Sequence, residues 1–414
     1  MSAHDDPEAP FRRWPRVRRR LGPGALWRTV RMPLRRRRWR KRNEAACAPW
    51  AKAAAPRAEG VALALGDFSG DNGLSRAALY ELARLRAEHP ALEVVDIGPA
   101  HGAGGGPRVH DGPVVGRLYL LSAPDTYAAA LTRLPPARVA EAWRVGLWVW
   151  ETPVLSNEWR FAFDVVHEIW TPSAYSAAPI LAAGADVPVT IRPHAVSPPP
   201  LGTPFDRAAF GVPERAFLGL AVMDCRSCPA RKNPWAHVAA WQRAFGDDPE
   251  RVLVLKIRLS RRTAVVREEL AEMIGRASNV IVVEDFLDAA TLAGLQRAAD
   301  VLVSLHRAEG YGLLVHEMLS LGTPVVATDW SANAEYARAY PAYRPVGYAM
   351  VPCRDWTRHY ADRRFLWAEA DVAAAAAALR EVAAAASRTP TADAVALSSR
   401  AAGAPSAGAA AGAP

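Results

Sequence analysis

The chain has 414 residues, half of them hydrophobic, a length that suits two domains of ordinary size better than one. Its formal net charge is +9, and its apolar runs all stop short of the roughly 20 residues that a membrane-spanning helix needs. The N-terminus is basic, but the apolar segment of about 7–15 residues that marks a secretory signal does not follow it. We therefore expect a cytoplasmic protein without a transmembrane helix.

The positive charge is concentrated in residues 11–42, which hold 15 Lys and Arg and no acidic residue. The remainder is acidic, with 36 basic and 42 acidic side chains. Trp14, Trp27 and Trp39 are interleaved with the basic residues, a composition that suits anionic lipid headgroups at a membrane surface. An inert solvated tail and a nucleic-acid contact are the alternative interpretations, and nucleic acid is the least favoured. The first interpretation predicts a peripheral protein on the inner face of the membrane.

Four cysteines are too few for a disulfide framework and fit a reducing compartment. Cys225 and Cys228 form a CxxC pair, but a structural zinc site would need a second pair of ligands at similar spacing. The sequence shows no such pair, and we expect neither metal nor redox use of these thiols.

From residue 60 onward, short β-rich runs alternate with longer helical segments, which is typical of a parallel α/β protein. The first unit has a strand at 61–65, a glycine-rich turn at 66–73 and a helix at 75–88. Further strands of this sheet are expected at 92–97, 117–121, 145–150, 167–170 and 187–191. A second sheet is expected from strands at 217–222, 252–257, 280–283, 301–305 and 324–327. The pattern predicts two doubly wound, Rossmann-like domains.

Proline and low-complexity segments mark the domain boundaries. The run SPPPLGT at 197–203 cannot continue a helix or a central strand, so it is the expected interdomain linker. HGAGGGP at 101–107 lacks the spacing of a dinucleotide phosphate loop and is expected to be a flexible turn. After residue 387 the chain is rich in Ala, Ser, Gly, Pro and Thr, which predicts disorder. The predicted division is a basic arm at 1–58, an N-terminal domain at 59–198, a C-terminal domain at 204–386 and a tail at 387–414.

The most informative stretch is HRAEGYGLLVHEMLSLGTPVVATDW at 306–330, where a strand ends, a glycine-containing turn follows and a helix begins near Tyr311. Gly310 and Gly312 allow backbone amides to approach a ligand closely, and the positive end of the helix favours a phosphate. Glu309 and Glu317 lie eight positions apart and can accept hydrogen bonds from sugar hydroxyls. The alternative is an ordinary strand–helix junction in which Glu317 is a solvated helix residue.

The segment EGYGLLVHE resembles the E-x7-E signature of retaining GT-B glycosyltransferases of family 4, also called glycosyl transferases group 1. MDCRSCPARKNPW at 223–235 is similar to the stretch that opens the C-terminal domain in that family. Four further segments resemble a bacterial branch of it: GLWVWETP at 146–153, EIWTPSAYSA at 168–177, RPHAV at 192–196 and WAEAD at 367–371. The likeness runs from about residue 60 to 385 and implies a GT-B architecture, with two Rossmann-like domains facing a central cleft.

The resemblance also implies roles for residues of the C-terminal domain. Lys232 would neutralise the diphosphate of the donor, and Glu309 would contact the transferred sugar and stabilise charge at the reacting centre. Glu317 would bind the ribose hydroxyls. The remaining donor-binding groups would be the backbone amides of Gly310, Tyr311, Gly312 and Leu313 around the phosphate and sugar, with Phe286 and Leu287 against the base.

The sequence departs from the family pattern at two places. Ser227 stands five residues before Lys232, where family members often have Arg, so that Arg231 and Arg226 become candidates for the second phosphate cation. On the acceptor side, the glycine loop contains Gly73, and Trp150-Glu151 stands by spacing where a His is common. Trp150 suits ordinary strand packing as well as contact with an acceptor. Either departure would alter the acceptor or weaken activity.

No DxD motif is present, and the resemblance likewise implies a metal-independent enzyme without a cofactor. The expected reaction is transfer of a hexose from a nucleoside diphosphate sugar to a glycan or lipid-linked acceptor, with retention, in bacterial surface polysaccharide synthesis. One alternative is a catalytically silent GT-B-fold subunit that binds a glycan or a nucleotide. Another is a tether in which the basic arm is the main functional element.

Overall fold

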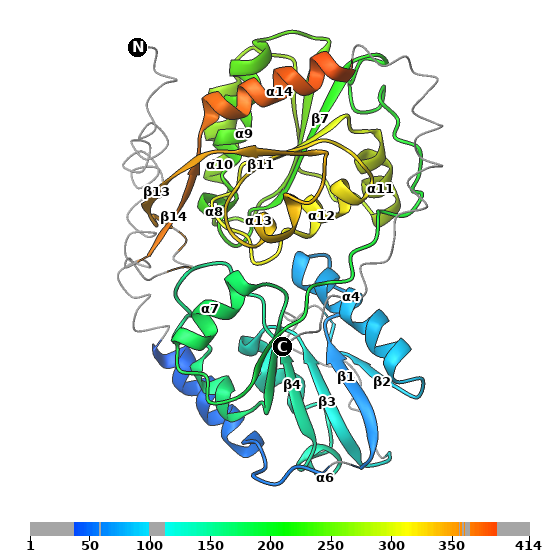
Figure 1. Cartoon of the computed structure of the whole chain (residues 1–414), viewed down its shortest axis with the longest axis vertical. Coiled ribbons are helices and arrows are strands. Elements are labelled where there is room, and N and C mark those ends of the chain that lie inside the picture. Colours follow the sequence, from blue (N-terminus) through cyan, green and yellow to red (C-terminus); the bar gives the residue numbers. More distant parts are fainter. Residues whose placement is uncertain are drawn as a thin grey trace, which may run out of the picture.

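A computed structural model describes residues 37–57, 59–98, 112–355, 357, 360 and 365–386. These ranges form two α/β domains, the C-terminal one above the N-terminal one in Figure 1, each built on a parallel six-stranded sheet. The predicted fold class, two Rossmann-like domains, is confirmed. Most of the predicted basic arm, the predicted turn at 101–107 and the predicted tail from 387 lie outside the described residues.

The N-terminal sheet has the strand order β2-β1-β3-β4-β5-β6. Its strands are β1 (Val61–Gly66), β2 (Glu93–Asp96), β3 (Val115–Leu121), β4 (Trp143–Leu147), β5 (Glu168–Thr171) and β6 (Val189–Ile191). The helices are α4 (Gly73–Glu88), α5 (Tyr127–Leu131), α6 (Pro136–Val139) and α7 (Ala174–Ala182), with 3-10 turns η1 (Ala48–Trp50), η2 (Pro124–Thr126) and η3 (Arg160–Asp164). All six strands predicted for this sheet are present. The central strands β1 and β3 are largely buried because both faces of the sheet are covered there, whereas the edge strands β2 and β6 are partly exposed.

Residues just before the first strand pack into this domain. Cys47 and Trp50 are buried in the core beneath the sheet, and the Trp50 carbonyl accepts a hydrogen bond from the buried guanidinium of Arg144. Lys52 pairs with Asp186 at 3.2 Å. The predicted boundary at residue 58 was placed where the charge changes, and the packed residues lie on its N-terminal side.

The C-terminal sheet has the strand order β12-β11-β10-β7-β8-β9. Its strands are β7 (Phe217–Asp224), β8 (Arg251–Arg258), β9 (Val280–Val283), β10 (Val301–Ser304), β11 (Val325–Thr328) and β12 (Tyr343–Val346). The helices are α8 (Pro229–Lys232), α9 (Pro234–Phe245), α10 (Val265–Ile274), α11 (Ala289–Ala298), α12 (Leu313–Ser320), α13 (Ala332–Ala337) and α14 (Val372–Ala386). The five predicted strands are present. The structure adds β12 and an antiparallel pair, β13 (Tyr348–Pro352) and β14 (Leu366–Ala370).

Strand order places the functional edge of each sheet. β1 lies between β2 and β3, and β7 lies between β10 and β8, so the chain changes direction beside these two strands. Parallel α/β sheets bind ligands at such switch points, at the carboxyl ends of the strands. The loops at these ends of the two sheets touch each other across the domain boundary, because Asp71 after β1 pairs with Arg226 after β7. The two binding edges therefore face each other.

The segment between the domains is extended and packs on α11. The Thr203 N–H donates to Ala290 O at 3.1 Å, and the Arg297 guanidinium donates to Pro200 O at 2.9 Å. Gly294 lets the two backbones approach, since a Cβ atom there would lie 1.8 Å from Thr203 O. No helix in the described ranges has both the length and the apolarity to cross a bilayer.

Candidate functional site

Three charged side chains meet where β7 and β10 end. Glu309 lies in the loop after β10, and its Oε1 atom is 2.5 Å from Nζ of Lys232, the last residue of α8. Nη1 of Arg231 is 3.2 Å from the same oxygen. Although Glu309 and Lys232 are 77 residues apart, adjacent strands bring them together. The structure thus joins the two residues to which the resemblance assigns the reacting centre.

The charge of Glu309 is fixed by its surroundings. Burial alone would raise the pKa of this carboxyl, but Lys232 and Arg231 outweigh that effect and lower the pKa to about 2. Glu309 is therefore ionised at neutral pH. The Glu309 and Lys232 side chains keep exposed fractions of 17% and 20%, so both charges retain contact with solvent.

Glu317 is fully buried, which excludes its interpretation as a solvated helix residue. Its Oε1 atom accepts hydrogen bonds from Tyr80 Oη at 3.0 Å and from the guanidinium of Arg76. Its Oε2 atom accepts from Gln296 Nε2 at 3.2 Å. Arg76 and Tyr80 belong to α4 of the other domain, so the predicted ribose ligand is occupied by side chains of this same chain.

The glycine turn before α12 has the conformation that the sequence predicts, but the helix begins at Leu313, two residues later than expected. Gly312 has a φ of +85°, a left-handed value that favours glycine. The carbonyl of Gly310 accepts hydrogen bonds from Ser173 Oγ at 2.8 Å and Ser176 Oγ at 3.1 Å. The predicted phosphate loop is therefore covered by the first turn of α7.

The Tyr311 side chain of this turn also contacts the N-terminal domain. It is buried, and its hydroxyl donates to His194 O at 3.2 Å. Since the Tyr311 hydroxyl already donates to His194 O, the backbone N–H of Tyr311 is the group left for a donor phosphate.

Glu151 connects the predicted acceptor side to the donor side. Its Oε1 atom is 3.5 Å from Arg231 Nη2, and its Oε2 atom accepts a hydrogen bond from Tyr360 Oη at 3.0 Å. Arg231 is buried and also donates to Ala308 O at 2.9 Å. The Arg231 guanidinium therefore bridges Glu151 and Glu309, carboxylates of different domains.

Trp150 packs as a core residue. Only 5% of it is exposed, its indole N–H donates to Val154 O at 2.9 Å, and its ring meets Trp159 edge-on at 4.8 Å. The packing interpretation therefore accounts for this side chain.

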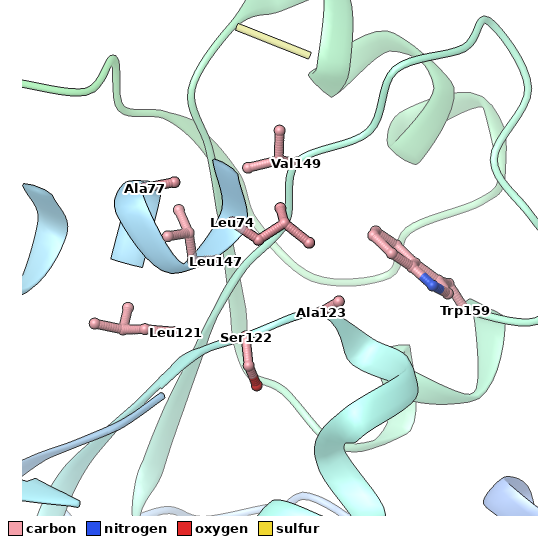
Figure 2. A pocket seen from close by; sticks show the side chains of 8 residues that line it. All are labelled: Leu74, Ala77, Leu121, Ser122, Ala123, Leu147, Val149 and Trp159. Carbon is pink, nitrogen blue, oxygen red and sulfur yellow. The ribbon is translucent and has the colours of Figure 1, made fainter. Parts of the chain in front are cut away.

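Gly73 is exposed at the start of α4, beside an apolar hollow at the carboxyl ends of β3 and β4. Figure 2 shows the residues that line this hollow: Leu74, Ala77, Leu121, Ser122, Ala123, Leu147, Val149 and Trp159. Gly73 thus adjoins this apolar depression through its neighbour Leu74.

The remaining predicted residues lie around the carboxyl ends of β7, β8 and β9. Ser227 is exposed in the turn after β7. Phe286 is 65% exposed, lies 5.6 Å from the Arg258 guanidinium and precedes the half-buried Leu287. Arg226 Nη2 lies 2.6 Å from Asp224 Oδ2, so this ion pair already neutralises the cation that a phosphate would need.

Sequence analysis did not identify the residues of the N-terminal domain that close on this site. Asp71, Arg76 and Tyr80 each contact the C-terminal domain. The only signal in the sequence was the four-residue spacing of Arg76 and Tyr80, which places them on one face of the predicted helix.

The CxxC pair has a structural position. Cys225 and Cys228 are buried free thiols, and Cys228 Sγ accepts from the Arg231 N–H at 3.4 Å at the start of α8. Burial raises the pKa of Cys228 well above its ordinary value. Within the described ranges, no three His, Cys, Asp or Glu side chains converge as metal ligands would. Independence from metals and cofactors stays a prediction.

Comparison with known proteins gives the following matches. Residues 235–402 match the model of a family described as family 4 glycosyltransferase in conflict systems. The chain is similar in structure to WaaG, a glycosyltransferase involved in lipopolysaccharide biosynthesis, with 14% identity, a TM-score of 0.50 and coverage of 82% of this chain and 94% of that one. No curated protein matches the chain at the sequence level.

Two further solved structures are similar at lower TM-scores. Anabaena HepE in complex with UDP and glucose is 15% identical, with a TM-score of 0.47 and coverage of 66% of this chain and 82% of that one. The trehalose-6-phosphate synthase OtsA is 10% identical, with a TM-score of 0.48 and coverage of 69% and 67%. The likeness to WaaG shows a two-domain fold of the GT-B kind, and residues 235–402 are similar to the family 4 glycosyltransferases that the family model describes.

Proposed function

We propose that the protein transfers a hexose from a nucleoside diphosphate sugar to a glycan or lipid-linked acceptor, with retention at the anomeric carbon and without a metal. The observation that carries this proposal is the contact of Glu309 with Lys232 and Arg231 at the carboxyl ends of β7 and β10. A carboxylate and a lysine that are both partly exposed suit a reaction in which a sugar becomes positive while a phosphate leaves.

The roles follow from where charge develops. The acceptor hydroxyl oxygen forms a bond to C1 of the sugar as the bond from C1 to the phosphate oxygen breaks, and the hydroxyl proton passes to the departing phosphate. Lys232 neutralises the growing negative charge on that phosphate. Glu309 stabilises the positive charge on the sugar ring. Attack from the face that the phosphate leaves retains the configuration, as the E-x7-E resemblance implies.

The acceptor is proposed to enter from the N-terminal domain. Leu74, the neighbour of Gly73, lines the hollow in Figure 2, and Glu151 lies 3.5 Å from Arg231, which in turn contacts Glu309. The likeness to a bacterial branch of the family, and the role of WaaG in lipopolysaccharide biosynthesis, support a place in surface polysaccharide synthesis. Peripheral membrane attachment through residues 11–42 belongs to the same proposal.

The test is turnover of UDP-, GDP- and ADP-hexoses by the purified protein without added metal, measured as released nucleoside diphosphate. We expect Glu309→Gln and Lys232→Ala each to lower the rate by about 10²–10³-fold, because each removes charge aimed at the reacting centre. Glu141→Gln is the matched control, since this carboxylate pairs with Arg57 on the surface. Unchanged turnover in both site variants would show that other residues carry the reaction.

The second candidate is a catalytically silent subunit with the same fold. It is favoured by the occupation of Glu317 by Arg76 and Tyr80 and by Ser227 in place of a cation. Nucleotide binding without turnover, equal in wild type and Glu309→Gln, would support this candidate.

A further inference from the structure

The carboxylate of Glu317 has no free oxygen. Tyr80 and Arg76 donate to Oε1, and Gln296 donates to Oε2. Tyr80 and Arg76 lie four residues apart on one face of α4, so a single helix supplies both contacts. Burial, with Glu317 as the next contribution, raises the pKa of Tyr80 to about 12, which keeps the phenol protonated and donating.

A second contact fixes the same helix at its N-terminal end. Asp71 precedes α4, and its carboxylate is 3.2 Å from Arg226 Nη2 and pairs with Arg258 as well. Burial alone would raise the pKa of Asp71, but Arg258 and Arg226 lower it, so the carboxylate is ionised at neutral pH. Residues 71–80 are thus held to the C-terminal domain at two points, one near the ends of β7 and β8 and one at α12.

These contacts overlap the place assigned to the nucleotide. On the proposed function, the ribose hydroxyls of the donor would donate to Glu317. A guanidinium and a phenol now fill those positions, and they offer the carboxylate the same kind of hydrogen bond. Glu317 Oε1 cannot accept strong hydrogen bonds from the ribose hydroxyls and from Arg76 and Tyr80 at the same time. Donor binding and the contacts of residues 71–80 with Glu317 therefore oppose each other.

We propose that residues 71–80 form an intramolecular latch that competes with the donor nucleotide for Glu317 and holds the two domains closed when no donor is bound. The inference rests on the proposed function for the identity of the ligand. A donor binds only when Arg76 and Tyr80 leave Glu317, so the apparent affinity is reduced by the fraction of molecules with the latch open. The contacts of residues 71–80 with the other domain are ion pairs and hydrogen bonds, whereas elsewhere the boundary also holds apolar packing, such as Trp150 against Tyr360.

Nucleotide binding tests the latch. In the full-length protein, we expect Arg76→Ala to lower the Kd for the best-bound of UDP, GDP and ADP by about tenfold, within the usual range of coupling between two sites. Tyr80→Phe, which removes only the hydroxyl, should lower this Kd by a smaller factor. Arg86→Ala is the matched control, since Arg86 is exposed in the last turn of the same helix. An unchanged or weaker affinity in Arg76→Ala would overturn the proposal, and a weaker one would make Arg76 a donor ligand.

A distance measurement separates this proposal from the proposed function. The four native cysteines are buried, so spin labels can be placed selectively through Ala87→Cys on α4 and Ser278→Cys before β9. We expect a single distance without nucleotide and an added longer one in Arg76→Ala. The same distribution in both proteins would overturn the latch. A longer distance together with no binding of any nucleotide would keep the latch and refute the donor assignment.

Discussion

Two buried histidines make the protein sensitive to mild acid. Burial lowers the pKa of both His194 and His237 to about 4. His237 must be neutral, because Nε2 accepts from the Leu305 N–H at 3.0 Å while Nδ1 lies 2.9 Å from Asn233 O. His194 makes no hydrogen bond through its ring in the described structure and lies edge-on to Tyr311. Both rings therefore resist protonation while the chain is folded.

The sign of the pH effect follows from this difference. The unfolded chain takes up protons near pH 6.5 and the folded chain does not, so stability present above pH 6.5 is lost as the pH falls toward 4. We expect the free energy of unfolding to fall by about 1.4 kcal/mol per pH unit for each histidine in this window. Urea unfolding at pH 7, 6, 5 and 4.5 measures this slope. If the free energy of unfolding of His194→Leu falls with pH as steeply as that of the wild type, the assignment to His194 is wrong.

Lys256 is a buried cation without a hydrogen-bond partner. It lies in β8 with 5% of its surface exposed, and Nζ is unpaired in the described structure. Burial lowers its pKa. We expect Lys256→Met to raise the free energy of unfolding by about 1–3 kcal/mol, since an unsatisfied buried donor costs roughly this much. Equilibrium unfolding in urea checks it, with Lys41→Met as the exposed control. A loss of stability would show that the ammonium has a favourable role in the fold.

The sequence predicted part of the site because part of it is local. The turn after β10 and the lysine after β7 each belong to a recognisable stretch, and the parallel sheet then dictates that Glu309 and Lys232 meet. Arg76 and Tyr80 left no such signal. They reach Glu317 across more than 230 residues, and only the relative placement of two domains brings them there.

At the scale of elements, continuous apolar runs allowed the strands of both six-stranded sheets to be predicted, except β12. The sequence of β12 is YRPV, in which Arg and Pro interrupt the run, and β13 is largely exposed. Neither has the pattern of a buried parallel strand. WAEAD was identified only as a motif, whereas the structure places most of it in β14, where Glu369 forms a buried ion pair with Arg307.

The contact between the linker and α11 depends on two glycines. A Cβ atom at Gly294 would lie 1.8 Å from Thr203 O, and one at Gly202 would lie 2.1 Å from Ala290 O. We expect Gly294→Ala to lower the free energy of unfolding by about 1–3 kcal/mol, because backbone atoms must move apart. Thermal and urea unfolding measure the loss.

Gly73→Ala is the matched control, since a Cβ atom there meets nothing within 4 Å. Alanine at this helix position should leave stability unchanged or raise it by up to about 1 kcal/mol. Equal losses in the two variants would show that the linker does not pack on α11 in solution.

Polar contacts and a shared apolar cluster, in which Trp150 packs on Tyr360, hold the two domains together. Glu335 in α13 accepts hydrogen bonds from the Ala174 and Tyr175 N–H groups at 3.0 and 2.7 Å, at the positive end of α7. These contacts join α7 to α13, and the pairs made by Asp71 and Arg76 join the start of α4 to the C-terminal domain. Ion pairs and hydrogen bonds exchange readily with water, whereas the apolar packing of Trp150 on Tyr360 must be exposed to water if the domains separate.

The N-terminal region combines two parts that truncation can separate. Residues 11–42 carry the basic charge, while Cys47 and Trp50 belong to the core of the N-terminal domain. Removing residues 1–36 should therefore leave unfolding by urea unchanged. If the basic segment binds lipid, the same truncation should weaken cosedimentation with anionic phosphatidylglycerol vesicles, with neutral phosphatidylcholine vesicles as the control.

Removing residues 1–58 should instead destabilise the fold. The core loses the Trp50 side chain, and the buried Arg144 guanidinium loses the Trp50 carbonyl that accepts its hydrogen bond. Trp50→Ala isolates the side chain and should cost about 3–5 kcal/mol, as for other buried tryptophans. Because this substitution keeps the carbonyl, a larger loss in the truncated protein measures what the backbone contacts add. Equal stability of the proteins starting at residues 37 and 59 would mean that residues 37–57 are not part of the folded domain.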